Sequence, residues 1–375
     1  MRVVLQSIPA LAAALALVVP ATARAGAPVD PPLAAFDAIA ARAQAKHGAP
    51  GFAFAVVHHG RTVYARGFGL ADVAQNEPVT RETPFVVGSI SKQFTAVAVL
   101  QLRDAGKLRL EDPLARYLPA LPNANAITLR MLLNQTSGLH NYPLTTEHPW
   151  PLTGAIAPRQ IFAFLATDRP DFEPGAQFEY SNANYAALAD VVARASGMTY
   201  DAYLRRKVFE PLGMASSGAG LGAQRAPLAT PYSGATAYTV PTPTLSLDLF
   251  YGAGSVVASA ADLARWDAAL LQGRFLGTRA RNDLWTAGRL ANGNAVPYAM
   301  GFVPESLAGH REVWHNGLTP LAGGYCYNAI FPDDDLAVIV LSNGSDFSDR
   351  PEAMVREVID AYFLHRIPLT PTGAK

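Results

Sequence analysis

The sequence predicts a mixed α/β (α+β) protein. We expect an antiparallel sheet formed from both termini, flanked by helices, with an inserted, mainly helical subdomain. Short apolar runs separated by turn residues occur near both ends of the chain, and helix-type patterns fill the middle. Half of the 375 residues are hydrophobic and 16% are charged, so the chain can bury a large core. We see no internal repeat and expect one domain over residues 26–375.

The first 25 residues read as a secretory signal peptide. Arg2 precedes an apolar stretch, and small residues follow Pro20 up to Ala23-Arg24-Ala25. Polar residues and prolines interrupt the apolar stretch, so it is too short to span a membrane. We expect cleavage after Ala25 and a periplasmic or secreted mature protein, with no later membrane span.

The two ends of the chain carry the patterns expected of the α/β part, about residues 33–95 and 246–368. A helix is predicted near Ala34–His47, followed by a hairpin whose turn is His59-Gly60-Arg61. The hairpin strands are Phe52–His58 and Thr62–Phe68, the later strands are Val313–His315, Gly323–Phe331 and Leu336–Ser342, and the later helices are Ala260–Leu271 and Pro351–Leu364.

The mainly helical part covers about residues 96–245. A helix over Ile90–Ala105 leads into it and is almost entirely apolar beyond Lys92, which predicts that this helix is central and buried. Further helices are predicted at Ile127–Leu133, Arg159–Leu165, Ala183–Ala195 and Tyr200–Phe209. The stretch Ala226–Leu245 is rich in Pro, Thr and Ser and predicts an extended loop.

Charge and motif content exclude several classes of function. The chain has 30 Lys+Arg and 30 Asp+Glu without runs of like charge, so nothing predicts binding to nucleic acid. Metal-ligand motifs are absent, so no metal and no cofactor are expected. The partner we expect is a small-molecule or peptide substrate; the oligomeric state stays open. Cys326 is the only cysteine, so no intrachain disulfide can form, and we expect it to be buried filler.

Ser89-Ile90-Ser91-Lys92 is the first candidate catalytic segment. It opens the buried helix, and a serine and a lysine three residues apart share one helix face. A lysine neutralised by burial can serve as base for the weakly nucleophilic hydroxyl, and a helix N-terminus favours an oxyanion. The alternative is a capping serine with a surface lysine, but a lysine that leads into an apolar helix should not be exposed.

Two further segments carry candidate site residues. In Tyr180-Ser181-Asn182, a tyrosine whose pKa is lowered by cations can relay a proton, and the Asn182 amide can contact both substrate and lysine; the alternative is a simple helix cap. His315-Asn316-Gly317-Leu318 ends a strand. There Gly317 would let substrate lie against the strand edge, and the Leu318 N–H would donate to an oxyanion. His315 would offer a hydrogen bond or partial positive charge, unless it is only a surface residue.

Together the three segments resemble the serine β-lactamase and penicillin-binding-protein superfamily, in its class C β-lactamase, D-aminopeptidase and esterase branch. The resemblance covers about Phe36 to Phe363 and includes Leu132–Leu139, Pro211–Met214 and Gly252–Ser255. It implies a β-lactamase/transpeptidase-like fold, with Ser89 as the acylated nucleophile and Lys92 and Tyr180 as proton carriers. It also implies that Asn182, His315 and Gly317 contact substrate and that the backbone N–H groups of Ser89 and Leu318 form the oxyanion hole.

The expected function is an exported serine hydrolase that acts on an ester, a D-amino acid peptide or amide, or a β-lactam through an acyl-enzyme. One departure from the family pattern bears on the choice, because many β-lactamases have a lysine where this chain has His315. A neutral imidazole binds a substrate carboxylate less firmly, which argues against strong β-lactamase activity. The alternative is a non-catalytic protein of the same fold that binds cell-wall peptides or penicillins.

Overall fold

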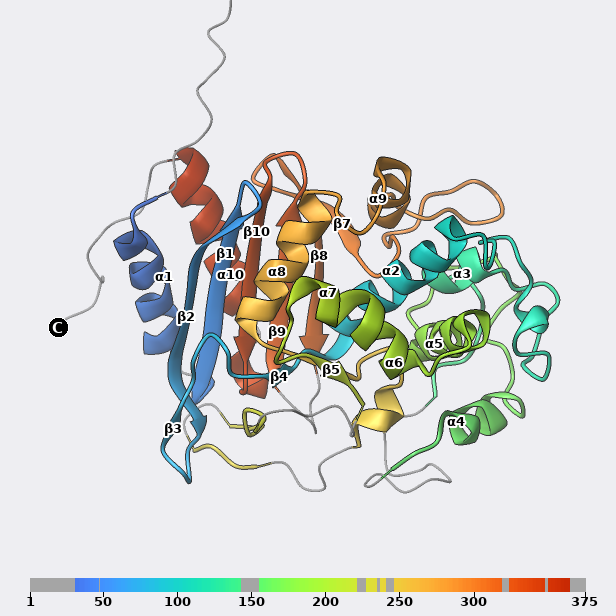
Figure 1. Ribbon diagram of the computed structural model, residues 1–375, viewed down its shortest axis with the longest axis horizontal. Coiled ribbons are helices and arrows are strands. Elements are labelled where there is room, and N and C mark those ends of the chain that lie inside the picture. The colour runs from blue at the N-terminus through green and yellow to red at the C-terminus, as the bar shows by residue number, and fades with distance from the viewer. Residues whose placement is uncertain are drawn as a thin grey trace, which may run out of the picture.

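A seven-stranded antiparallel sheet in the order β3-β2-β1-β10-β9-β8-β7 forms the centre of the protein (Figure 1). The computed structural model describes residues 31–46, 48–142, 155–220, 227–234, 237–240, 246–318, 324–347 and 350–364. Its strands are β1 (Gly51–His58), β2 (Arg61–Asp72), β3 (Glu77–Pro78), β7 (Val303–Leu307), β8 (His310–Leu318), β9 (Tyr325–Phe331) and β10 (Leu336–Ser342). Strand β1 pairs with β10, so both ends of the chain build one sheet, and the predicted fold class is confirmed.

Helices cover both faces of this sheet. Helices α1 (Leu33–Ala45) and α10 (Arg350–Ile359) pack together on one face, and α8 (Ala260–Leu271) crosses the other (Figure 1). Strands β1 and β10 are therefore buried at every position, as expected for strands with both faces covered. Cys326 lies in the core on the α8 side, where burial raises the pKa of its thiol to about 12, and its prediction as buried filler is confirmed.

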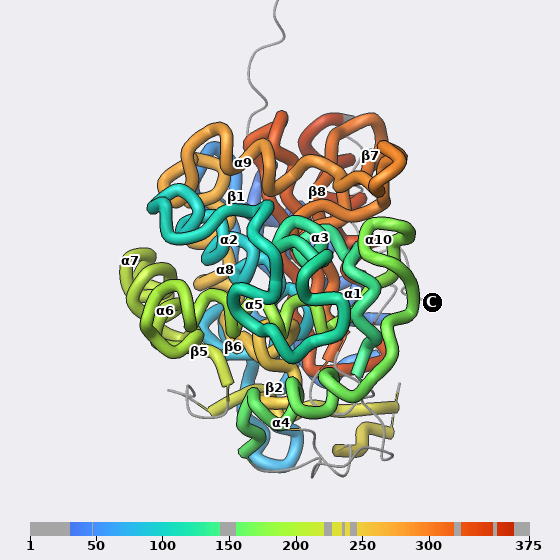
Figure 2. Tube along the Cα trace, turned by 90° about the vertical axis from the view of Figure 1, so that its right-hand side faces the viewer, coloured from blue at the N-terminus to red at the C-terminus, as the bar shows by residue number. Residues whose placement is uncertain are grey.

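The helical unit lies at one end of the sheet and is organised around the buried helix α2 (Ser91–Asp104) (Figure 2). Its helices are α3 (Leu129–Leu133), α4 (Pro158–Leu165), α5 (Asn182–Ser196), α6 (Tyr200–Leu204) and α7 (Glu210–Leu212), and α9 (Thr278–Trp285) lies near α2. The ring of Phe94 on α2 stacks on Trp266 of α8, with ring centroids 4.2 Å apart, and meets Phe209 edge-on. These aromatic contacts join the helical unit to the sheet layer.

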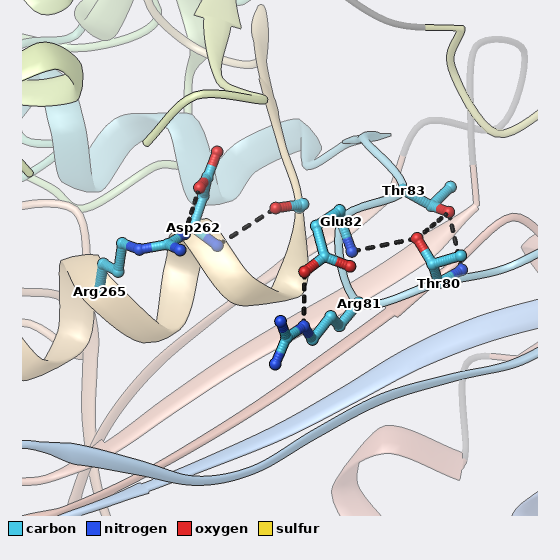
Figure 3. Close-up of polar contacts among 7 residues, drawn as sticks. Thr80, Arg81, Glu82, Thr83, Asp262 and Arg265 are labelled. Atoms are coloured by element: carbon cyan, nitrogen blue, oxygen red, sulfur yellow. Dashed lines mark hydrogen bonds and ion pairs between the residues drawn. The ribbon is translucent and has the colours of Figure 1, made fainter. Parts of the chain in front are cut away.

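A small sheet connects the large sheet with the helical unit, and its strand β4 comes just before the candidate site in the sequence. It consists of β4 (Phe85–Val86), β6 (Val256–Ala258) and β5 (Gly218–Ala219) in the order β4-β6-β5. The turn Thr80–Thr83, closed by a 2.8 Å bond from the Thr80 N–H to the Thr83 hydroxyl, precedes β4 and lies beside the start of α8 (Figure 3). The Ala261 N–H donates to the Arg81 carbonyl at 3.0 Å, which ties α8 to the segment that leads into Ser89.

Several elements differ from the sequence predictions. Strand β8 is longer than the predicted Val313–His315, and β7, α9 and the small sheet were not predicted. Pro304, Glu305 and Ser306 make β7 a poor strand sequence, and it forms because β8 offers it an edge to pair with. The predicted Tyr200–Phe209 helix is α6 followed by a wider π turn at Arg205–Phe209.

Some predictions lie outside the described residues. These are the signal peptide and parts of the predicted Ala226–Leu245 loop. The signal peptide therefore stays a prediction.

Replacing Phe94 by alanine should destabilise the protein by about 3–5 kcal/mol, because it empties a fully buried site between α2 and α8. Leu33→Ala is the control, since Leu33 is 52% exposed, and it should cost less than about 1 kcal/mol. Urea unfolding followed by circular dichroism measures both. Equal effects of the two substitutions would contradict this account of the core.

Candidate active site

Ser89 lies at the partly exposed point of an otherwise buried segment. It follows β4 in a short 3-10 turn, Gly88–Ile90, and α2 begins only at Ser91, so Ser89 precedes the helix rather than opening it as predicted. Val87, Gly88 and Ile90 are buried around it. The buried flanks hold the backbone, while the hydroxyl stays accessible for reaction.

Lys92 is fully buried, as the apolar helix behind it predicted. Its amino group donates to Asn182 Oδ1 at 2.9 Å and to the Ala253 carbonyl at 2.8 Å. The same nitrogen lies 3.0 Å from Ser89 Oγ. Burial holds the pKa of Lys92 well below its usual range. A neutral amine has two N–H groups, which the two acceptors occupy, and one lone pair left for the Ser89 hydroxyl.

Tyr180 donates from its hydroxyl to Ser89 Oγ at 2.8 Å, so the serine oxygen lies between Tyr180 and Lys92. The lysine nitrogen also lies 4.7 Å from the centre of the Tyr180 ring. The expected lowering of the Tyr180 pKa by cations is wrong in this structure, because burial raises it. The neighbouring amine of Lys92 has a lowered pKa itself, so it is a weaker source of positive charge than an ordinary lysine. Tyr180 is therefore a protonated donor.

Asn182 is the first residue of α5, and its segment both caps the helix and contacts Lys92; the predicted contact with substrate stays a prediction. Ser181 caps the helix, accepting from the Ala183 N–H at 3.2 Å, while the Asn182 side chain points at Lys92. The Asn182 N–H donates to Asn141 Oδ1 at 2.9 Å. The cap fixes the start of α5 and so fixes the distance between the asparagine amide and the lysine.

His315 is buried, not a surface residue, and both of its ring nitrogens have partners. Its Nδ1 lies 2.6 Å from the Asn316 carbonyl, which can only accept, so Nδ1 carries the proton. Its Nε2 accepts from the Tyr298 hydroxyl at 3.0 Å. Burial, with a smaller effect of Lys92, lowers the pKa of His315 to about 3. The expected partial positive charge is therefore wrong: the imidazole is neutral and orients Tyr298, whose ring meets that of Tyr180 edge-on.

Gly317 has a packing role that was not predicted from the sequence, while its predicted role beside the substrate stays a prediction. A Cβ atom at this position would lie 1.9 Å from the Val87 carbonyl oxygen, so the absence of a side chain lets β8 pack against the segment before Ser89. Leu318, the next residue, is 48% exposed and ends β8. This packing brings the end of β8 beside the turn that carries Ser89.

Sequence reasoning missed three contributors to the site. The Ala253 carbonyl holds Lys92, and its segment Gly252–Ser255 was noted only as part of a resemblance. Tyr298 links His315 to the aromatic group around Tyr180 and has no motif of its own. Gln135 has φ 61° and accepts from the Ser181 N–H at 3.1 Å and from the Asn184 side chain. A non-glycine residue with positive φ in a loop can point to a special position, but a φ angle is known only from the backbone structure and not from the sequence.

Over the part of the chain that the structure describes, no three His, Cys, Asp or Glu side chains are grouped so as to hold a metal ion. In the same part, no helix is long and apolar enough to cross a membrane. At Ser89 the structure brings together a hydroxyl, an amine and a phenol.

Comparison with known proteins gives consistent results. The family model described as "Beta-lactamase" matches residues 36–361. The chain is 32% identical over 294 residues to "Putative penicillin-binding protein PbpX" of Bacillus subtilis (strain 168), covering 77% of this chain and 69% of that protein. It is 28% identical over 308 residues to "D-aminopeptidase" of Brucella anthropi, covering 78% of this chain and 56% of the relative.

Among solved structures, D-amino acid amidase from Ochrobactrum anthropi SV3, complexed with D-phenylalanine, superposes with a TM-score of 0.75. The match covers 89% of this chain and 99% of the amidase at 23% identity. At that identity the likeness shows a shared fold.

Gly317→Ala should force β8 away from Val87 and destabilise the protein by about 1–3 kcal/mol, with a parallel loss of any reaction at Ser89. Gly277→Ala is the matched control, because a Cβ there meets no heavy atom within 4 Å. Thermal unfolding and the rate of covalent labelling of Ser89 measure the two effects. If Gly317→Ala behaves like Gly277→Ala, the close approach described above is not needed.

Proposed function

The chain belongs to the Beta-lactamase family, and on that premise we propose that it is a serine hydrolase that cleaves an ester or amide through an acyl-enzyme on Ser89. One observation carries the proposal: Ser89 Oγ lies 3.0 Å from the fully buried amine of Lys92 and 2.8 Å from the hydroxyl of Tyr180. A burial-neutralised amine next to a serine hydroxyl has the properties of a general base.

In the proposed acylation, the Lys92 lone pair accepts the proton of Ser89 while Oγ bonds to the substrate carbonyl carbon. The carbonyl electron pair moves to oxygen, where the backbone N–H groups of Ser89 and Leu318 would stabilise it. The new ammonium of Lys92 is stabilised by Asn182 Oδ1 and the Ala253 carbonyl.

Collapse of this intermediate breaks the bond to the leaving nitrogen or oxygen. Tyr180 is a protonated donor next to Ser89 Oγ, so it supplies the proton that the leaving group needs, and the Lys92 ammonium returns a proton to it. Water then attacks the carbonyl carbon of the Ser89 ester while Lys92 accepts a proton from it. The bond between this carbon and Ser89 Oγ breaks, Lys92 returns the proton to Oγ, and the acid is released.

For the substrate, we propose a compound that has no carboxylate beside the reacting carbonyl. Lys92 and Tyr180 contact Ser89 Oγ, and Asn182 and His315 lie next to these two side chains. Burial lowers the pKa of Lys92 and of His315 and raises that of Tyr180, so it disfavours a charge on each of them. A carboxylate at this position would meet, among these four, no side chain whose surroundings favour a positive charge. The D-aminopeptidase and D-amino acid amidase relatives make D-amino acid amides the first compounds to test.

The test of the nucleophile is labelling by a fluorophosphonate, with turnover of a chromogenic ester, a cephalosporin and a D-amino acid amide. Ser89→Ala should abolish labelling and lower kcat by at least ~10⁴-fold, whereas Tyr180→Phe should lower it by about 10²-fold. Ser196→Ala and Tyr203→Phe are matched controls away from the site and should react normally. Labelling of the wild type without turnover of any substrate would favour the non-catalytic alternative, and absence of labelling would refute the proposal.

The pH dependence should follow Lys92 and not His315. Below the lowered pKa of Lys92 its amine is protonated and cannot accept the Ser89 proton, so kcat/KM should rise with pH and then level off. His315, with a pKa of about 3, stays neutral from pH 5 to 9. His315→Gln should therefore lower the rate by about 10- to 100-fold through lost positioning, but keep the shape of the profile. A profile that flattens in His315→Gln would assign the titration to the imidazole instead.

Export forms a separate part of the proposal and rests on the first 25 residues of the sequence. Expression of the full chain in a Gram-negative host should give a periplasmic or extracellular protein that begins at Gly26, as measured by intact mass. Ala25→Leu should block this processing, because small residues are needed at the cleavage site. A cytoplasmic protein that keeps Met1–Ala25 would contradict it.

A further inference from the structure

Strand β8 has a second face that the proposed catalysis does not use. Val313 and His315 point toward the α8 side of the sheet, so Glu312 and Trp314 point toward the side that α1 and α10 cover. On that side a cavity of about 760 Å³ lies between α10 and the edge strands β7, β8 and β9. Figure 1 shows α10 and α8 on opposite faces of this sheet.

The cavity is strongly acidic. Five of its lining residues are acidic and one is basic: Glu305, Glu312, Glu352, Glu357 and Asp360, against Arg356. Glu357 is paired with Arg42 outside this set. The other carboxylates form no ion pair in the described part of the chain. The cavity therefore has an excess of negative charge.

Two of these carboxylates face each other directly. Glu305 on β7 is the register partner of Glu312 on β8, and like charges directly opposite on neighbouring strands destabilise a sheet. Only 3% of Glu312 is exposed, and among the described residues its carboxylate accepts one hydrogen bond, from the Tyr327 hydroxyl at 3.5 Å. A carboxylate this deeply buried normally has a cation or several donors as partners.

The electrostatic cost appears in the pKa of Glu312, which is raised to about 7. Burial is the main cause, and the carboxylates of Glu305 on β7 and Glu352 on α10 add to it. The Tyr327 hydroxyl on β9 and Arg356 on α10 act in the opposite direction without cancelling it. Above neutral pH, an added positive charge in the cavity would relieve this cost.

An aromatic wall completes the site. The rings of Trp314 and Tyr327 stack with centroids 5.0 Å apart and planes 12° from parallel. The Trp314 indole N–H donates to Glu305 Oε2 at 2.9 Å, which fixes the Glu305 carboxylate at the edge of the rings. Aromatic faces next to carboxylates are the surroundings that organic cations prefer, since the ring attracts the charge and the apolar stem packs on it.

We propose that this cavity binds an organic cation, an ammonium or guanidinium group on an aliphatic stem, between Glu312 and the Trp314–Tyr327 wall. The described residues offer no grouping of three metal ligands here, so an organic cation fits better than a bare metal ion. The cation is either a free amine or a basic side chain of a peptide. The site lies on the face of β8 opposite His315, so it is distinct from the site at Ser89.

Isothermal titration calorimetry on the purified chain at pH 8 tests the proposal with three probes. These are 1,4-diaminobutane, N-acetyl-arginine amide and, as neutral isostere, N-acetyl-citrulline amide. One or both cations should bind at least about 10-fold more tightly than the citrulline compound. Tighter binding of the diamine assigns a free amine, and tighter binding of the arginine compound assigns a basic side chain. Binding should be the same in Ser89→Ala, which separates this cavity from the proposed catalysis.

Variants locate the binding. Glu312→Gln should weaken it by about 10- to 100-fold, and Glu352→Gln, an exposed position on α10 that tolerates substitution, should weaken it by a smaller factor. Glu77→Gln on β3, at the opposite edge of the sheet, is the matched control and should bind normally. Affinity in the wild type should rise from pH 6 to pH 8 as Glu312 ionises, and Glu312→Gln should lose most of this rise. Absence of cation binding at 10 mM, equal binding of the citrulline compound, or unchanged affinity in both cavity variants would overturn the proposal.

Discussion

A lysine amine buried without a carboxylate partner is the constraint on which the site depends. Lys92 forms no ion pair among the described residues, and a charged amine in that position would pay a desolvation penalty of several kcal/mol. Its two N–H groups are satisfied by Asn182 at the start of α5 and by the Ala253 carbonyl before β6. Three segments far apart in the sequence must therefore converge within hydrogen-bond distance. Three features hold these segments in place: the buried apolar sides of α2, its aromatic contact with α8, and the cap of α5.

The side chains around Ser89 are polar, but burial disfavours a permanent charge on them. Burial raises the pKa of Tyr180, which keeps its proton, and lowers the pKa of His315, which is uncharged. Both ring nitrogens of His315 form hydrogen bonds, one with the Asn316 carbonyl and one with the Tyr298 hydroxyl. Charge would then appear only during reaction, where fixed dipoles stabilise it at low reorganisation cost. The other face of β8 has the opposite character, with unneutralised carboxylates on an aromatic wall. Because neighbouring residues of a strand point to opposite sides, one strand separates these two environments.

Much of the fold could be predicted from the sequence, because the spacing of apolar residues along a helix or strand is a local property of the chain. The β10 bounds, the hairpin, the buried α2 and the position of Lys92 followed from apolar patterns and turn residues. Strand β7 did not, since it depends on an edge that β8 supplies. The candidate site residues were predicted as three short segments, and the imidazole of His315 was expected to be neutral. The raised pKa of Tyr180 was not predicted, because burial is set by distant parts of the chain. The reason for Gly317 was equally hidden, since Val87 lies in another segment and only packing brings its carbonyl there.

The pairing of β1 with β10 has a consequence for how the chain acquires its structure. The Gly51 N–H donates to the Asn343 side chain across 292 positions of sequence, so the centre of the sheet closes only when almost the whole chain has been synthesised. Contacts between such distant segments raise the contact order, and loop closure of this length slows folding. The segment with Ser89 and Lys92 emerges early, but the turn that holds the amine and the strand that packs behind Val87 emerge late. In an incomplete chain the Lys92 amine would be solvated and charged, and it would become buried only when the turn with Ala253 and strand β8 are in place.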